Sequence, residues 1–274
     1  MKRFVAIFVL LVFLAVPAWA FLLGGMATNA TVGGLNKKAP SEISGLTAWY
    51  KATAITDKAD GATLTDWPDS SPGGRNLTQG GTSPVYKTNM IGGKPAVRFD
   101  GQETTYFAST AGSDEYLSFT GYTVFAVLKV NAVQRNTSPS FSWWSNDTIW
   151  TFAGHIVAGM TLRTNEGDYR LIAGGYEADS DVRYVEDAIA LDTKRIAVSW
   201  FDGTSLHLQL NGGEVQSVEH TGPHSLTSAV LRIGAQFQQG SEIDLADISF
   251  FNVSVPAGDR DAVTNWLKFE YGFL

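Results

Sequence analysis

From Leu46 onward, apolar and polar residues alternate along the chain in short runs that Gly, Asn, Asp and Pro interrupt. A period of two residues is typical of β-strands that bury one face. The strongest runs are residues 123–130 and 194–201. Weaker runs indicate further strands at 46–51, 95–99, 104–108, 148–152, 156–163, 169–173, 182–190, 205–210, 230–235 and 243–252. Many short strands of this kind predict an all-β sandwich or barrel rather than βαβ units.

Two dipeptides predict tight hairpin turns. Asp202-Gly203 follows one strong strand, and Asn211-Gly212 follows the next. Both are residue pairs that tolerate the backbone conformations of two-residue turns. Residues 194–210 are therefore expected to form a β-hairpin that continues into a second turn.

The helical period appears once, near the C-terminus. After Pro256, the apolar residues Val263, Trp266, Leu267 and Phe269 recur at the spacing of one helix face. A proline at the start and a Tyr-Gly pair at the end are suitable helix boundaries. We expect one short amphipathic helix there, with Trp266 holding it against the sandwich.

The N-terminus has the composition of a secretory signal. Two basic residues precede an unbroken apolar run, and Ala18-Trp19-Ala20 supplies small residues at the positions that a signal peptidase reads. Residues 1–20 are therefore expected to be a signal peptide that directs a secreted, extracellular or cell-surface protein. The alternative is an uncleaved membrane anchor, because residues 21–23 extend the apolar stretch to about the 20 residues that a bilayer needs. Residues 21–44 are interpreted as a flexible linker or N-terminal arm, and residues 45–274 as one domain.

Composition narrows the class of partner. The 274 residues are 44% hydrophobic and 17% charged, which is typical of a globular chain. A formal net charge of −7 makes the protein a poor non-specific partner for nucleic acid or anionic lipid. The chain has no cysteine, so disulfides and thiolate chemistry are excluded.

Five motifs, in order, resemble the laminin-G-like domains of the concanavalin A-like lectin/glucanase group. They lie at residues 45–50, 64–74, 91–101, 200–213 and 243–252. The resemblance implies a jelly-roll of two antiparallel sheets with a short closing helix, and it does not specify an activity. The residues themselves favour structural roles: Trp49, Trp67 and Phe99 belong in a core, and Asp69 begins a turn that its own side chain can cap.

The segment 141–150 is the best candidate for carbohydrate binding. Its tryptophans could stack against sugar rings while short polar side chains bond to hydroxyl groups. The candidate binding residues are Trp143, Trp144, Asn146, Asp147, Trp150 and Tyr176, with Tyr169 and Tyr184 as extensions of the platform. The alternative is that some of these tryptophans fill the interior of the sandwich.

One acidic cluster suggests catalysis. Glu242, Asp244 and Asp247 resemble the signature of laminarinase-type glycoside hydrolases, which need two carboxylates about 5–5.5 Å apart. Glu242 and Asp244 share one face of a strand, whereas Asp247 falls on the opposite face unless a bulge intervenes.

Metal sites have weaker support. Calcium is a candidate because acidic residues recur in the expected loops, at Asp147, Glu166, Asp168, Asp179 and Asp181. No specific calcium-binding motif is present, so a solvated acidic surface is the competing interpretation. His220 and His224 are four residues apart, but Pro223 between them argues against a zinc-binding helix face.

Three function classes follow. The first is a secreted lectin-like module that binds a glycan or polysaccharide without catalysis, in adhesion at a cell or virion surface. The second is a structural or assembly protein of a surface or virion, which leaves a homo-oligomer open. The third is a glycoside hydrolase that uses the acidic cluster. Membrane contact is expected only through an uncleaved N-terminal segment.

Overall fold

A computed structural model describes most of the chain outside the N-terminus. The described residues are 35–102, 104–118, 120–133, 147–153, 158–165, 168–176, 182–221, 229–234 and 241–273. The chain divides into two units, Met1–Asn36 and Lys37–Leu274. Every feature below belongs to the second unit. This unit begins before Gly45, the start expected from composition, because Pro40 and Ile43 are already buried in it.

The described residues form two eight-stranded antiparallel sheets. The first sheet has the order β14-β13-β12-β7-β16-β5-β4, and β1 also pairs with β16. Its strands are β1 (Leu46–Lys51), β4 (Val85–Ile91), β5 (Lys94–Asp100), β7 (Tyr122–Ala132), β12 (Lys194–Phe201), β13 (Ser205–Leu210), β14 (Val215–Glu219) and β16 (Glu242–Phe251). The first and last of the described strands, β1 and β16, thus lie side by side.

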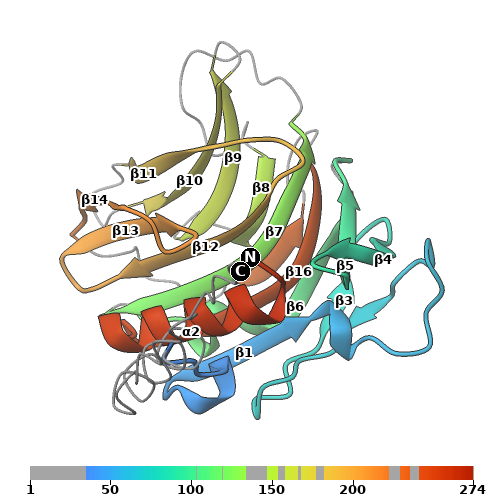
Figure 1. Ribbon diagram of the computed structural model, residues 1–274, viewed down its shortest axis with the longest axis horizontal. Coiled ribbons are helices and arrows are strands. Elements are labelled where there is room, and N and C mark those ends of the chain that lie inside the picture. Colours follow the sequence, from blue (N-terminus) through green and yellow to red (C-terminus); the bar gives the residue numbers. More distant parts are fainter. Residues whose placement is uncertain are drawn as a thin grey trace, which may run out of the picture. The chain divides into compact units, whose positions relative to one another are not determined.

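The second sheet has the order β11-β10-β9-β8-β15-β6-β3-β2. Its strands are β2 (Asp66–Trp67), β3 (Leu77–Gln79), β6 (Tyr106–Gly112), β8 (Asp147–Ala153), β9 (Gly159–Asn165), β10 (Asp168–Tyr176), β11 (Val182–Ile189) and β15 (Val230–Gly234). The predicted class, an antiparallel two-sheet sandwich with one short C-terminal helix, is confirmed. Helix α2 (Ala257–Glu270) follows β16, and short 3-10 turns occur at Pro40–Glu42, Ala52–Ala54 and Ser113–Glu115. Figure 1 shows the two sheets and α2.

The main core lies between the sheets and is rich in aromatic side chains. Trp67 and Trp150 are fully buried, and the ring of Trp150 contacts Phe250 of the facing sheet edge-on at 5.5 Å. Trp49, Trp67 and Phe99 are all buried, as predicted. Burying a large apolar side chain stabilises the fold by about 1.5–3 kcal/mol, so this layer supplies much of the driving force for folding.

A second apolar cluster lies on the other side of the first sheet, under α2. Val263 and Leu267 of the helix pack there against Phe125 and Val127 of β7. Trp266 meets Trp49 edge-on at 5.8 Å between ring centroids. The expected role of Trp266 is confirmed, and the helix covers one outer face of the sandwich.

Four strands were not predicted, namely β2, β3, β4 and β14. The first two are only two and three residues long. Strand β14 is an edge strand with the sequence Val-Gln-Ser-Val-Glu, in which three residues are exposed. Short or exposed strands need little apolar alternation, so a hydrophobic pattern does not mark them.

Within the part of the chain that the structure describes, no helix is both long and apolar enough to cross a membrane. The expected signal peptide, residues 1–20, and most of the arm, residues 21–44, lie outside the described residues.

Candidate functional site

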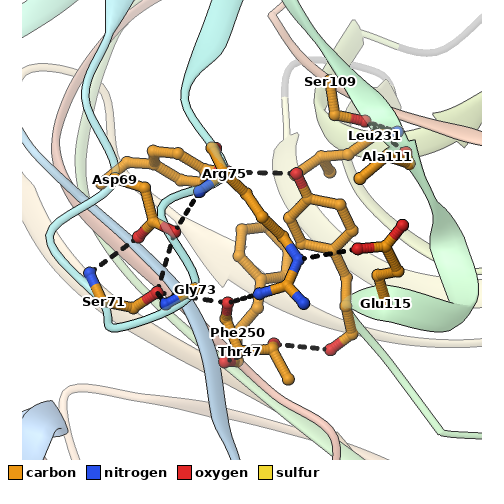
Figure 2. A network of polar contacts seen from close by, with 12 residues as sticks. Thr47, Asp69, Ser71, Gly73, Arg75, Ser109, Ala111, Glu115, Leu231 and Phe250 are labelled. Atoms are coloured by element: carbon orange, nitrogen blue, oxygen red, sulfur yellow. Dashed lines mark hydrogen bonds and ion pairs between the residues drawn. The ribbon is translucent and has the colours of Figure 1, made fainter.

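One large polar network has a structural role. The Asp69 carboxylate accepts hydrogen bonds from the backbone N–H groups of Trp49, Ser71 and Arg75 at 2.8–2.9 Å, and from the hydroxyl of Ser71. Figure 2 shows this side chain at the centre of its loop. Such a carboxylate fixes the turn by satisfying its backbone donors. Asp69 therefore caps the turn in which it lies, as predicted.

Arg75 connects this loop to the opposite sheet. Its guanidinium donates to the carbonyl oxygen of Thr47 at 2.8 Å and pairs with Glu115 at 3.2 Å. It also lies 5.9 Å from the ring centre of Tyr116. All of these partners belong to the chain itself, so the network of Figure 2 holds neighbouring loops together.

The acidic cluster on β16 is tied up in internal contacts. Asp244 is fully buried, and Arg98 donates to both of its oxygens at 2.7 and 2.9 Å. Asn131 donates to it at 2.9 Å, and Lys129 lies 3.6 Å away. Glu242 pairs with the same Arg98 at 3.1 Å. A hydrolase needs one carboxylate free to attack and another free to donate a proton, and this arrangement leaves neither role to Asp244.

A bulge does bring Asp247 to the face of Asp244. The register of β16 against β7 shifts between Leu245 and Asp247. Asp247 is buried under α2, where it accepts hydrogen bonds from the Trp49 indole at 2.8 Å and the Tyr271 hydroxyl at 3.0 Å. Burial raises the pKa of the Asp247 carboxyl to about 7, against the lowering effect of these two donors and Lys51.

The outer face of the second sheet carries a different kind of cluster. Strand alternation defines that face: Met160, Leu162 and Phe152 point into the inter-sheet core, so their neighbours point away from it. We call the outward set on β8–β11 and β15 the arginine face. It consists of Thr151, Thr161, Arg163, Arg170, Ile172, Tyr184, Glu186 and Arg232.

Arg163 stands at the centre of the arginine face. Its guanidinium donates to Glu186 of β11 at 2.7 Å and lies 5.8 Å from the ring centre of Tyr184. Register places Arg170 of β10 directly opposite Arg163. The side chains of Arg163, Glu186 and Arg170 are 21%, 28% and 34% exposed, so their charged heads reach solvent.

Two threonine hydroxyls lie on the same face, with Thr161 two residues before Arg163 on β9 and Thr151 opposite Gly159 on β8. Thr151 and Thr161 are 2% and 1% exposed, and neither hydroxyl has a hydrogen-bond partner. The Nε of Arg163 is also buried without a partner. Unsatisfied buried polar atoms are costly and call for an explanation.

An aromatic side chain flanks each end of this face. Tyr184 lies beside Arg163, while at the other end the guanidinium of Arg232 lies 4.9 Å from the ring centre of Tyr106. Gly159 and Gly174 face one another in register between the two ends. Neither position carries a side chain between the two cation–aromatic pairs, and both glycines are buried.

The structure describes only some of the predicted carbohydrate-binding residues. Trp143, Trp144 and Asn146 lie outside the described residues. Asp147 begins β8 and Tyr176 ends β10, and their side chains are likewise outside the description.

Trp150 requires a correction. Its side chain is fully buried in the core between the sheets, so it presents no ring face to a sugar. Of the suggested extensions, Tyr169 packs against that core, and Tyr184 belongs to the arginine face.

Metal ligands do not gather in the described part of the chain: no group of three or more His, Cys, Asp or Glu side chains there could hold an ion. Among the acids considered for calcium, Asp168 lies in β10, 3.8 Å from Arg170. Glu166, Asp179 and Asp181 fall outside the described residues, as does His224.

Sequence reasoning missed Arg163 and Arg170 because it weighed aromatic residues first. The only sequence signal was that each arginine occupies an outward-facing position of its strand. That signal is weak, because any polar residue can occupy such a position on an exposed sheet.

Comparison with known proteins bears on the fold. No protein-family model and no curated protein matches this chain. Many solved structures do. The binding domain of Paraclostridial Mosquitocidal Protein 1 matches with a TM-score of 0.56 and 11% identity, over 81% of this chain and 52% of that one. The binding domain of botulinum neurotoxin serotype G matches with a TM-score of 0.59 and 10% identity, over 81% and 51%.

The chain therefore spans about half the length of the solved structures it matches. At such identities the likeness shows the fold. Two further matches are complexes: a botulinum neurotoxin serotype D ligand-binding domain with N-acetylneuraminic acid, at 11% identity and TM-score 0.55, and a serotype DC binding domain with rat synaptotagmin II, at 10% and 0.56. The laminin-G-like resemblance remains a prediction beside them.

Proposed function

We propose that the protein is a secreted module that recognises a glycan without catalysing a reaction on it, and that the arginine face is its binding surface. The observation that carries this proposal is the pairing of Arg163 with Glu186 beside the ring of Tyr184, on a sheet face that carries two further arginines. Sugars offer both hydroxyl groups and apolar ring faces, and these match polar heads beside an aromatic ring.

The charges favour an acidic sugar. Arg163, Arg170 and Arg232 lie on the face, against Glu186 and the nearby Asp168. A guanidinium binds a carboxylate through two parallel hydrogen bonds, which gives both energy and direction. The solved complex of a structural neighbour with N-acetylneuraminic acid, an acidic sugar, supports the choice of ligand class but not the location of the site.

The test is a glycan array probed with the purified full chain and with two variants. Arg163→Ala removes the central head of the face, and we expect it to weaken binding by about tenfold or more, the loss of one charge-assisted contact. Lys58→Ala is the matched control, since Lys58 is an exposed cation in the loop before β2 and is not part of the arginine face. It should bind as the unaltered chain does.

The outcomes separate the function classes. Binding to acidic glycans that Arg163→Ala weakens and Lys58→Ala leaves unchanged supports the proposal. Binding that both variants retain moves the site elsewhere, toward residues 141–150. A folded protein that binds no glycan overturns the proposal and favours a structural or assembly role, for which sedimentation would then measure the oligomeric state.

A further inference from the structure

A second cluster of reactive side chains lies on the first sheet, on the hairpin of β12, β13 and β14. His207 is within hydrogen-bond distance of two groups: its Nε2 lies 2.9 Å from Asp202 Oδ2, and its Nδ1 lies 2.7 Å from the hydroxyl of Ser217. An acid, an imidazole and a serine hydroxyl thus form one continuous chain. We propose that Ser217 is an activated nucleophile and that this hairpin hydrolyses small carboxylic esters.

Asp202 is held in place as an anion. Its Oδ1 accepts hydrogen bonds from the backbone N–H groups of Thr204 and Ser205 at 2.9 and 2.8 Å, and from the Thr204 hydroxyl at 2.9 Å. These donors and His207 keep the pKa of the Asp202 carboxyl well below its usual range, despite the opposing effect of burial. Its Oδ2 remains directed at the imidazole.

This anion selects the tautomer of His207. A carboxylate can only accept, so the ring proton lies on Nε2, and Nδ1 is left as an acceptor for the Ser217 hydroxyl. Stacking fixes the ring as well: it lies on the indole of the buried Trp200, with centroids 4.7 Å apart and planes 16° apart. Nucleophile, base and orienting acid therefore hold the relation that acyl transfer requires, with the two ring nitrogens exchanged relative to the common serine-protease arrangement.

The strand register places Ser217 for access to solvent. His207 and Ser217 are directly opposite each other in the antiparallel pair, and Ser217 is exposed on the edge strand β14. The backbone N–H of His220 donates to Thr204, so the bonded and non-bonded pairs alternate from there, and His207 and Ser217 form a non-bonded pair. Side chains approach most closely in such pairs, and the N–H of Ser217 points away from β13, toward the side from which an oxyanion could accept it.

The reaction balances with water alone. Ser217 Oγ attacks the ester carbonyl carbon while its proton passes to His207 Nδ1. The carbon–oxygen bond to the alcohol breaks, and the departing alkoxide takes that proton. Water then attacks the acyl-serine, gives one proton to Nδ1, and releases the carboxylic acid as the proton returns to Ser217.

The test is covalent labelling of the full chain with a fluorophosphonate probe, read by peptide mass spectrometry. We expect an adduct on Ser217, none at that peptide in Ser217→Ala, and an unchanged adduct in Ser44→Ala, which removes another exposed serine. Asp202→Asn keeps an acceptor for the turn but loses the charge, so labelling should slow roughly 100-fold. Hydrolysis of p-nitrophenyl acetate should fall in step with labelling.

Two results would overturn the proposal. One is a folded, unaltered protein that gives no adduct on Ser217 at pH 8. The other is an adduct that forms equally fast in His207→Gln, because the serine would then react without its base. In either case the three side chains serve only to hold the hairpin, and His207→Gln would lower the melting temperature without a change in reactivity.

Discussion

Asp247 is a carboxyl group enclosed by β1, β16 and the end of α2. Its two hydrogen-bond donors, Trp49 and Tyr271, belong to the first strand and to the residue after the helix. One side chain thus joins the two ends of the compact unit. Its protonation state should consequently affect how firmly α2 is held.

We expect stability to depend on pH through Asp247. The pKa of this carboxyl is about 7 in the folded protein, above its ordinary value near 4, so the folded state binds the proton more tightly. The stabilisation from this group is present at pH 4 and is lost as the pH rises to 7. Asp247→Asn keeps an acceptor for Trp49 and carries no charge. In urea unfolding, the free energy of unfolding of the variant relative to the unaltered protein should rise by a few kcal/mol between pH 5 and pH 8. A difference in unfolding free energy that does not change with pH would contradict the raised pKa.

At the scale of elements, the apolar packing of α2 is confined to its inner face. Leu267 is 1% exposed in the cluster beneath the helix, whereas Phe269 is 61% exposed, two residues further on. Leu267→Ala should lower the free energy of unfolding by about 3 kcal/mol, since it leaves a cavity. Phe269→Ala removes only a cation–π contact with Lys37 and should cost about 1 kcal/mol or less. Equal losses in chemical denaturation would mean that the helix does not pack as described.

The strands show which parts of the fold can be predicted from the sequence. Residues 194–201 and 205–210 were predicted to the residue, because buried alternation and Asp-Gly mark both the strands and their turn. The bulge before Asp247 has no local marker, since it depends on how β16 pairs with β7. The pairing of His207 with Ser217 likewise depends on the length of the second turn. The arginine face was not predicted for a related reason. Arg163 of β9 and Glu186 of β11 come together across β10, and this depends on the order of the strands in the sheet.

At the scale of the molecule, β16 is the central connection of the first sheet. It pairs with β1, β5 and β7, so three strands from the first half of the chain depend on a strand near its end. A fold built on such distant pairings forms slowly and as a whole.

Truncation provides the test at this scale. A chain that ends at Ser241 lacks β16 and α2, and it should show no cooperative melting transition by circular dichroism. A chain that begins at Lys37 removes a similar length outside the compact unit, and it should melt cooperatively. A sharp transition in the first chain would mean that the sandwich survives without its central strand.

The backbone N–H of Lys38 donates to the carbonyl oxygen of Ala262 in α2, and the Lys38 side chain pairs with Asp259 at 2.6 Å. The start of the compact unit therefore runs along its final helix. A short glycine-rich peptide could join the two ends, and the exposed segment from Asp57 to Gly61 could supply new ones. Such a circular permutant should fold with the same two sheets. The fold would then depend on which strands pair in space and not on the order in which they are synthesised.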